Sequence, residues 1–290
     1  MRAFIVLGLA VLLAGVPALD VAAQERLGAQ GPEGAPHRRQ QWLVASPEPG
    51  VAAHALLFRP AGAGPFPLAL IAHASTQNAL RRAQMPQPEY RALAGLLVAR
   101  GFAVLVPERP GHGATGGAYR EDQGGCDNAD YLRAGQATAE SIAAALVSMR
   151  AQPFVRKDGA IVIGHSAGGW GALALAQANP KGVSRIVVFA PGRGGHADDR
   201  PNAICAPQAL LTAAAAFGRG ARIPVLWLVA ANDSYFAPDI SRRMAEAFGS
   251  GGDAVDFRAL PSFGDEGHWM AERDGGEAVY GTVLDDVLRR

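Results

Sequence analysis

A G-x-S-x-G motif at residues 164–168 stands between an apolar run and a run that favours helix. This pattern predicts a strand that turns sharply into a helix, because the two glycines leave room for a tight turn. Such a turn holds Ser166 in a strained backbone conformation that lifts its hydroxyl clear of the sheet. Glycine is common in the chain, with 36 among 290 residues, so the strand and helix patterns on either side carry the interpretation. We interpret Ser166 as a nucleophile.

The N-terminal segment has the pattern of a secretory signal peptide. Arg2 precedes an apolar run over residues 3–19, and small residues close the segment. We predict a signal peptide over residues 1–23, a disordered leader over 24–39 and one domain over 40–290. The alternative is an uncleaved membrane anchor, but the run is short for a span and contains glycines and a proline. The pattern therefore predicts export to the periplasm or the cell exterior, without stable membrane insertion after cleavage.

The composition indicates a globular domain that acts on a small molecule. Apolar residues make up 49% of the chain, which is enough for a full core, and the length suits one large domain. The net charge is +1, with acids and bases mixed along the chain. Proteins that bind nucleic acid generally present a basic face, so no nucleic-acid partner is expected.

Apolar runs alternate with helical patterns after residue 40, which predicts an α/β fold with a mostly parallel, eight-stranded sheet and helices on both faces. The expected strands cover residues 40–45, 54–60, 67–73, 102–108, 160–165, 185–190, 223–230 and 254–260. The expected helices cover residues 88–100, 130–150, 167–178, 238–249 and 275–289, with a short alanine-rich helix inside 191–222. The first two strands look like an edge hairpin. The later ones are continuously apolar, as is typical of strands buried on both faces.

Two long segments, residues 109–129 and 191–222, interrupt this alternation, and each carries one of the two cysteines. Both segments follow expected strands, and loops at the carboxyl ends of parallel strands surround the crevice of an open α/β sheet. In an exported protein a disulfide between Cys126 and Cys205 would persist and join the two segments. The alternative is a pair of free or buried thiols.

Asp233 and His268 complete a pattern of nucleophile, acid and base in chain order. A serine hydroxyl needs a base within hydrogen-bond reach and a third group that orients this base. Asp233 directly follows the most apolar strand, and His268 follows the next one on a glycine-flanked loop. This order predicts that Ser166, Asp233 and His268 meet at one edge of the sheet. Asp265 and Glu266 are competing acids, but they are too close to His268 in sequence to reach its far ring nitrogen with good geometry.

The negative charge that develops on a carbonyl oxygen during ester or amide cleavage needs two backbone N–H donors. Ala167, directly after the serine, is expected to supply one, and the loop after the third strand the other. Ser75 is our candidate in that loop, with Ala74 as the alternative. His73 ends the preceding strand and is expected to organise the loop.

Three further side chains are candidate substrate contacts. His196 lies in the insertion after the sixth strand, and Arg109 and Tyr119 lie in the glycine-rich loop after the fourth. Arginines on such loops could hold a carboxylate-bearing or polyphenolic ester, or form a solvated rim. His112 is expected to brace a turn, and His165 to pack near the top of the sheet.

Over residues 40–290 the chain resembles the α/β-hydrolase superfamily, through the motif around Ser166 and the positions of Asp233 and His268. Within this superfamily it resembles the dienelactone-hydrolase-like group of exported hydrolases with one domain. The resemblance implies a catalytic triad of these three residues, no metal or other cofactor, and an acyl-enzyme route. The chain departs from dienelactone hydrolases in its serine, where they carry cysteine, and in Ala74, where the common oxyanion motif has glycine.

Together these features predict a serine esterase that cleaves carboxylic esters of small molecules. A small peptidase or amidase would use the same triad, and a non-catalytic binding protein could keep the same fold. All three triad residue types are present, which disfavours the binding protein.

Overall fold

The computed structural model describes residues 27–251 and 255–288. The predicted signal peptide, residues 1–23, and the first three residues of the predicted leader lie outside this range.

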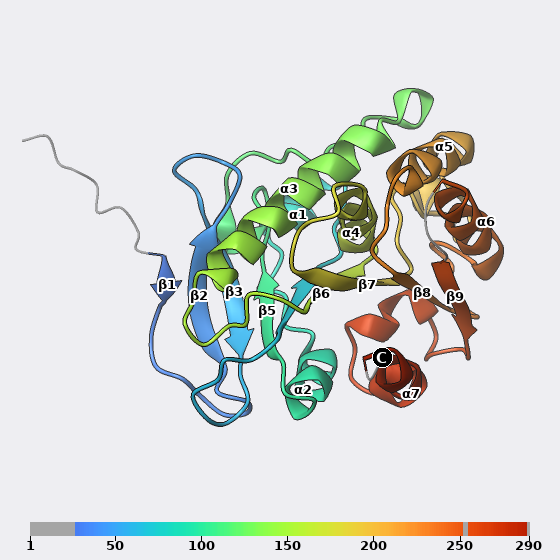
Figure 1. The fold of residues 1–290 in the computed structure, drawn as a ribbon. Coiled ribbons are helices and arrows are strands. Elements are labelled where there is room, and N and C mark those ends of the chain that lie inside the picture. The colour runs from blue at the N-terminus through green and yellow to red at the C-terminus, as the bar shows by residue number, and fades with distance from the viewer. Residues whose placement is uncertain (1–26, 252–254, 289–290) are drawn as a thin grey trace, which may run out of the picture.

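Nine strands in the described residues form one sheet in the order β1-β2-β3-β5-β4-β6-β7-β8-β9 (Figure 1). Their bounds are β1 Gly28–Ala29, β2 Gln40–Ala45, β3 Ala52–Phe58, β4 Leu68–Ala72, β5 Ala103–Pro107, β6 Ala160–His165, β7 Val183–Phe189, β8 Val225–Ala230 and β9 Val255–Leu260. The hairpin β2–β3 pairs antiparallel with β5, and the strands from β5 through β9 run parallel. The predicted edge hairpin and mostly parallel sheet are therefore confirmed.

Residues 27–39 differ from the predicted disordered leader. β1 pairs antiparallel with β2 and adds a ninth strand at the edge of the sheet. Glu33 forms ion pairs with Arg38 and Arg59, which attach this segment to the end of β3. The segment is polar and rich in glycine and proline, and composition alone does not reveal that a neighbouring strand offers it backbone partners.

Helices cover both faces of the sheet. Their bounds are α1 Ala79–Ala83, α2 Arg91–Ala99, α3 Tyr131–Arg150, α4 Ala167–Gln177, α5 Pro207–Gly218, α6 Pro238–Gly249 and α7 Glu277–Leu288. Figure 1 shows α3, α4, α5 and α6 on one face and α2 and α7 on the other. The expected helix over 88–100 begins only at Arg91, because Tyr90 has a left-handed backbone (φ 50°) that is incompatible with a helix interior.

The two apolar layers explain why the central strands are apolar at every position. In β6, Val162 packs into the layer under α3 and α4, whereas Ile161 and Ile163 pack into the layer under α2 and α7. Successive side chains of a strand point to opposite faces, so both sets must be apolar when both faces are covered. The carboxyl ends of these strands are then free to carry polar residues.

Candidate active site

Ser166 lies at the sharp turn between β6 and α4, with φ 53° and ψ −117°. A positive φ in a non-glycine residue costs about 1–3 kcal/mol and persists only where the surroundings enforce it. Two glycines enforce it here: a Cβ at Gly164 would lie 2.5 Å from Gly169 Cα, and a Cβ at Gly168 would lie 2.1 Å from the Ala72 carbonyl oxygen. The predicted strand–turn–helix geometry is present, and the Ser166 side chain is held above the sheet edge.

Asp233 and His268 meet through their side chains. Asp233 follows β8, His268 lies in the short 3₁₀ helix η4 (Gly267–Ala271), and Asp233 Oδ2 is 3.0 Å from His268 Nδ1. The other carboxylate oxygen accepts the backbone N–H groups of Tyr235 at 2.9 Å and Phe236 at 2.8 Å. Burial by itself raises the pKa of Asp233, but the hydrogen bonds from His268 and from these N–H groups bring it below its ordinary value. Asp233 is therefore an anion that orients the His268 ring.

Glu266 has a different relation to His268. Its carboxylate accepts the backbone N–H of His268 at 3.0 Å and the backbone N–H of Ser234 at 3.1 Å, and it also accepts the Ser234 hydroxyl. Asp265 is exposed. Of the three acids weighed from the sequence, Asp233 is the one that contacts the imidazole, as the sequence order predicts.

A stack of three rings covers one face of His268. Tyr235 stacks on His268 with 4.2 Å between ring centroids, and His196 stacks on the far side of Tyr235 at 3.6 Å. His196 Nε2 also lies 2.7 Å from the Ser234 hydroxyl. Tyr235 was not predicted as a site residue, although its place two residues after Asp233 was the available signal.

Ser166, His268, Ala167 and His196 line one cavity of about 470 Å³. Both Ser166 and His268 are nearly buried, with 7% and 2% of their surfaces exposed, and both line this cavity. Within residues 27–251 and 255–288, no hydrogen bond joins the Ser166 hydroxyl to the His268 ring. In free enzymes the contact between nucleophile and base is often loose and tightens when substrate binds.

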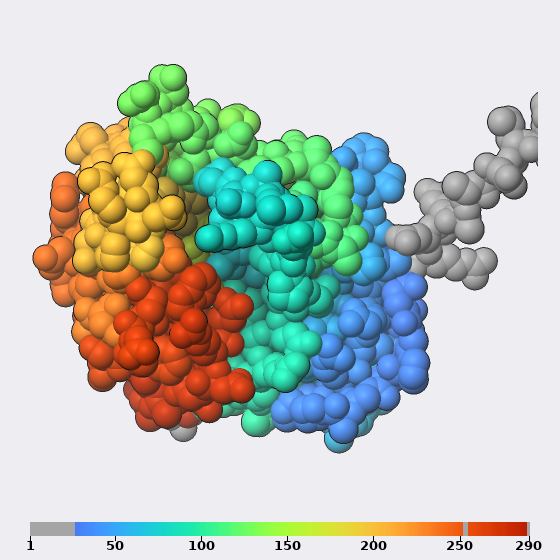
Figure 2. Space-filling model, turned by 180° about the vertical axis from the view of Figure 1, so that it is seen from behind, coloured from blue at the N-terminus to red at the C-terminus, as the bar shows by residue number. Residues whose placement is uncertain are grey.

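A second cavity of about 810 Å³ lies beside the first. The residues that line both cavities are Ala74, Ser75, Thr76, Arg81 and Trp269. Figure 2 shows a hollow between the cyan segment, which contains α1, and the red C-terminal segment. These shared residues form a wall between the two cavities. Each cavity has the volume needed for a small organic molecule.

The backbone N–H groups of Ala167 and Ser75 donate to no other group within the described residues. The Ala74 N–H, by contrast, donates to the Tyr90 hydroxyl at 3.1 Å, so it is not free to bind a ligand. The Ser75 side chain is fixed by His112, whose Nε2 lies 2.7 Å from the hydroxyl. Of the two alternatives left open by the sequence, this geometry favours Ser75 over Ala74.

Two buried histidines support this loop, residues 73–76, which we call the oxyanion loop. His73 Nδ1 contacts the Ala74 carbonyl oxygen at 2.5 Å, and its Nε2 accepts the Arg109 N–H at 3.1 Å. Burial lowers the pKa of His73 well below its ordinary value, and it lowers the pKa of His112 to about 4. Both rings are therefore neutral near pH 7, and the neutral state of His112 lets its Nε2 accept the Ser75 hydroxyl.

Arg109 and Tyr119 do not line either cavity, which corrects their predicted role as substrate contacts. Only 2% of Arg109 is exposed, and its guanidinium donates to the carboxylate of Glu121 and, at 2.7 Å, to the His73 carbonyl. The Tyr119 hydroxyl accepts from Arg193 at 3.3 Å. From the sequence alone, an arginine that binds substrate or faces solvent looks the same as one that forms a buried ion pair, as Arg109 does with Glu121.

Glu121 is the centre of this buried charge cluster. Its carboxylate binds the guanidiniums of both Arg109 and Arg193. Burial alone would raise the pKa of Glu121, but the two cations hold it well below its ordinary value. The cluster joins the end of β5 to the segment after β7, and of its members only Arg193 lines the Ser166 cavity.

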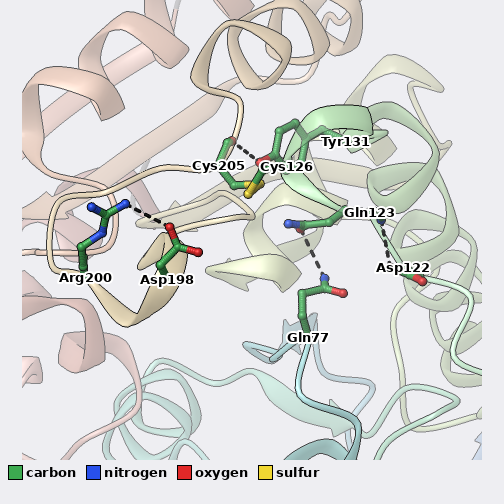
Figure 3. Close-up of a disulfide and its surroundings, with 9 residues drawn as sticks. Gln77, Asp122, Gln123, Cys126, Tyr131, Asp198, Arg200 and Cys205 are labelled. Atoms are coloured by element: carbon green, nitrogen blue, oxygen red, sulfur yellow. Dashed lines mark hydrogen bonds and ion pairs between the residues drawn. A yellow bond between two sulfur atoms is a disulfide. The ribbon is translucent and has the colours of Figure 1, made fainter.

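A disulfide joins Cys126 to Cys205, as predicted, with 4.9 Å between their Cα atoms (Figure 3). It connects residues 109–129 with the segment after β7, which carries His196. The Tyr131 hydroxyl donates to the Cys205 carbonyl beside it. Both segments border the Ser166 cavity, so the disulfide restrains its wall.

Within residues 27–251 and 255–288, the histidine, cysteine and acidic side chains form no group of three or more that could hold a metal ion. In the same range, none of the helices has the length and apolar character needed to cross a membrane.

A family model described as serine aminopeptidase, S33, matches residues 87–220. A search of curated proteins finds no match to the chain.

Several solved structures share the architecture. Est1E from Butyrivibrio proteoclasticus with ferulic acid bound is 17% identical with a TM-score of 0.58, and the match covers 85% of this chain and 98% of that one. Acetyl xylan esterase 1 from Thermoanaerobacterium sp. is 17% identical with a TM-score of 0.56, covering 91% and 86%. Dipeptidyl peptidase 4 from Porphyromonas gingivalis is 14% identical with a TM-score of 0.58, covering 87% and 35%. The chain therefore has the α/β-hydrolase fold.

Proposed function

We propose that this protein is a serine hydrolase that cleaves carboxylic esters of small molecules. The observation that carries the proposal is the Asp233–His268 hydrogen bond beside a strained Ser166, in one cavity bordered by two unpaired backbone N–H groups. Each part of this arrangement corresponds to one requirement of acyl transfer.

In the proposed reaction, His268 donates its Nδ1–H to Asp233, which leaves Nε2 free to accept the Ser166 proton. The hydroxyl oxygen attacks the ester carbonyl, and the N–H groups of Ala167 and Ser75 bind the oxyanion. His268 then gives its proton to the departing alcohol. Water, deprotonated by the same ring, hydrolyses the acyl-enzyme and releases the acid.

The proposal includes the dienelactone-hydrolase-like grouping, the absence of a required cofactor, and export to the periplasm or the cell exterior. The Cys126–Cys205 disulfide supports export, because disulfides persist in oxidising compartments. His196 is the candidate substrate contact that lines the cavity. The acetyl xylan esterase of similar fold is the analogy for ester chemistry, which rests on the fold alone.

The second candidate function is a small peptidase or amidase with the same triad. It is favoured by the match to the serine aminopeptidase model and by similarity to dipeptidyl peptidase 4, although the chain covers only 35% of that protein. A non-catalytic binding protein would not need a strained serine beside an oriented histidine.

Hydrolysis of a p-nitrophenyl ester series from acetate to palmitate tests the proposal, with protein starting at Gln24 and its Ser166→Ala variant. We expect activity on short chains that falls by about 10⁴-fold or more in the variant. Aminoacyl p-nitroanilides, assayed in parallel, report on the peptidase. Activity that survives in Ser166→Ala would contradict the assignment, and labelling of Ser166 by a fluorophosphonate without any turnover would favour a different substrate class.

A further inference from the structure

A chain of hydrogen bonds links the oxyanion loop to the backbone of His268. The Ala74 N–H donates to the Tyr90 hydroxyl at 3.1 Å, and this hydroxyl lies 3.0 Å from His165 Nδ1. On the other side of the ring, His165 Nε2 lies 2.7 Å from the His268 carbonyl oxygen. His165 and Tyr90 are buried, with 1% and 2% of their surfaces exposed. The chain crosses the interior from one side of the Ser166 cavity to the other.

When His165 is neutral, the two ends of this chain fix the position of every proton in it. The His268 carbonyl only accepts, so His165 Nε2 must carry the ring proton, and Nδ1 then has a lone pair. Tyr90 donates its O–H to that lone pair, and its oxygen accepts the Ala74 N–H. Of the two neutral tautomers of His165, only the one with the proton on Nε2 satisfies all three bonds.

The surroundings of His165 favour this neutral state. Burial, and then the nearby His268, lower the pKa of His165 to about 3. The hydrogen bond to the His268 carbonyl, and then Asp233, act in the opposite direction, and the carboxylate of Glu272 lies 4.0 Å from Nδ1. Burial raises the pKa of Glu272 as well, which weakens it as a partner for a charged imidazole. His165 therefore serves as a fixed neutral connector at neutral pH.

We infer that His165, acting through Tyr90, is a positioning residue that holds the oxyanion loop and the His268 backbone at a fixed separation. The inference rests on the proposed function, because it gives Ser75 and His268 their roles at the reacting carbonyl. The Ala74 N–H is occupied by its hydrogen bond to Tyr90, whereas the next N–H, that of Ser75, is unpaired among the described residues. The same ring restrains the residue whose imidazole must move the proton.

Such a connector acts on the transition state more than on substrate binding. The oxyanion and the transferred proton exist only as the reaction proceeds, so a shift between Ser75 and His268 lowers kcat and leaves KM little changed. Misplacement by about 1 Å can reduce a rate about 100-fold.

Tyr90→Phe removes one hydroxyl and so breaks the connection with the smallest change. We expect its kcat on p-nitrophenyl acetate to fall about 10- to 100-fold with little change in KM. Phenylboronic acid, which forms a tetrahedral adduct with a serine and occupies an oxyanion hole, should bind more weakly by a similar factor. Tyr280→Phe is the matched control, because its buried hydroxyl has no hydrogen-bond partner among the described residues, and it should leave all three quantities unchanged.

A lower melting temperature with wild-type kcat and inhibitor affinity per folded molecule would make the Tyr90 hydroxyl merely structural and overturn the inference. If Tyr90→Phe does not fold, His165→Gln and His165→Leu replace it. Glutamine keeps one donor and one acceptor on a planar group, so it should retain more kcat than leucine, and equal values would contradict the inference.

Fluorophosphonate labelling separates this inference from the proposed function. If the wild-type protein is labelled at Ser166 but hydrolyses no ester, the ester proposal fails, and the labelling rates of the same variants still test the connector. If wild-type Ser166 is not labelled at all, neither the oxyanion hole nor a connector that serves it is supported.

Discussion

Asp233 and Glu266 both bind His268, but they bind different parts of it. Asp233 contacts the ring at Nδ1, whereas Glu266 contacts the backbone N–H. A group on the ring sets which nitrogen carries the proton, and a group on the backbone only restrains the loop. The two carboxylates should therefore differ sharply in their effect on catalysis.

We predict that Asp233→Asn lowers kcat by about 10⁴-fold, because an amide can donate to Nδ1 and stabilise the tautomer whose Nε2 cannot accept the Ser166 proton. Glu266→Gln should lower kcat far less, since its amide oxygen still accepts the His268 N–H. Steady-state kinetics on one ester checks both. Equal losses in the two variants would mean that the loop position, and not the tautomer, limits the rate.

At the same scale, the sequence predicted that Asp233 and His268 lie together, but it did not predict the residues that hold them in place. Chain order and position after strands are local signals, so they predict that Ser166, Asp233 and His268 lie together. The stacking of Tyr235 on His268 depends on ring orientations that no spacing rule contains. Arg109 was misassigned for a related reason, since its partner Glu121 becomes buried only when two long segments fold over it.

At the scale of elements, the sheet could be predicted because its strands are apolar runs bounded by polar residues. β2 and β6 have the predicted bounds, and the other predicted strands differ from the structure by at most two residues at either end. β1 was missed because a strand of two residues has no periodicity to detect. The segment over 109–129 and the part of 191–222 before α5 contain only short 3₁₀ turns, so their mutual placement depends on cross-links.

The disulfide is the covalent cross-link between these segments, and we predict that the double variant Cys126→Ser, Cys205→Ser is less stable. The cysteines are 79 residues apart, and closing a loop of that length contributes at most about 4.5 kcal/mol to the free energy of unfolding. Urea unfolding of the oxidised protein and the variant measures the loss. Fluorophosphonate labelling of Ser166 should persist in the folded variant, because Arg193 and Glu121 still join the segments. Unchanged stability would contradict the prediction.

At the scale of the whole molecule, the edge of the sheet that carries the site is rich in buried neutral histidines. His73, His112 and His165 each hold a loop through a ring nitrogen that accepts a hydrogen bond, from Arg109 N–H, from Ser75 and from Tyr90, respectively. Burial is the largest cause of the lowered pKa in all three. These three histidines therefore hold the loops around the site as neutral rings near pH 7.

These lowered pKa values predict that stability falls with acid. A histidine that stays neutral when folded binds a proton only after unfolding, so between its folded and unfolded pKa the unfolded chain holds more protons and the free energy of unfolding falls as pH falls. For His112 this window runs from the ordinary value of 6.5 down to about 4, and for His165 down to about 3. The lowered pKa values of Asp233 and Glu121 act in the same direction but only below their ordinary values of about 4.

We therefore expect the free energy of unfolding to decrease between pH 7 and pH 5, by on the order of 1 kcal/mol for each buried histidine. Urea unfolding at several pH values measures this slope, and His112→Asn, which removes one titrating ring, should make it shallower whatever its effect on stability at pH 7. Carboxylates alone would give a curve that is flat above pH 5 and falls only below it. A curve of that shape would show that the histidines titrate normally in the folded protein, and the neutral supports assigned to the oxyanion loop would have to be abandoned.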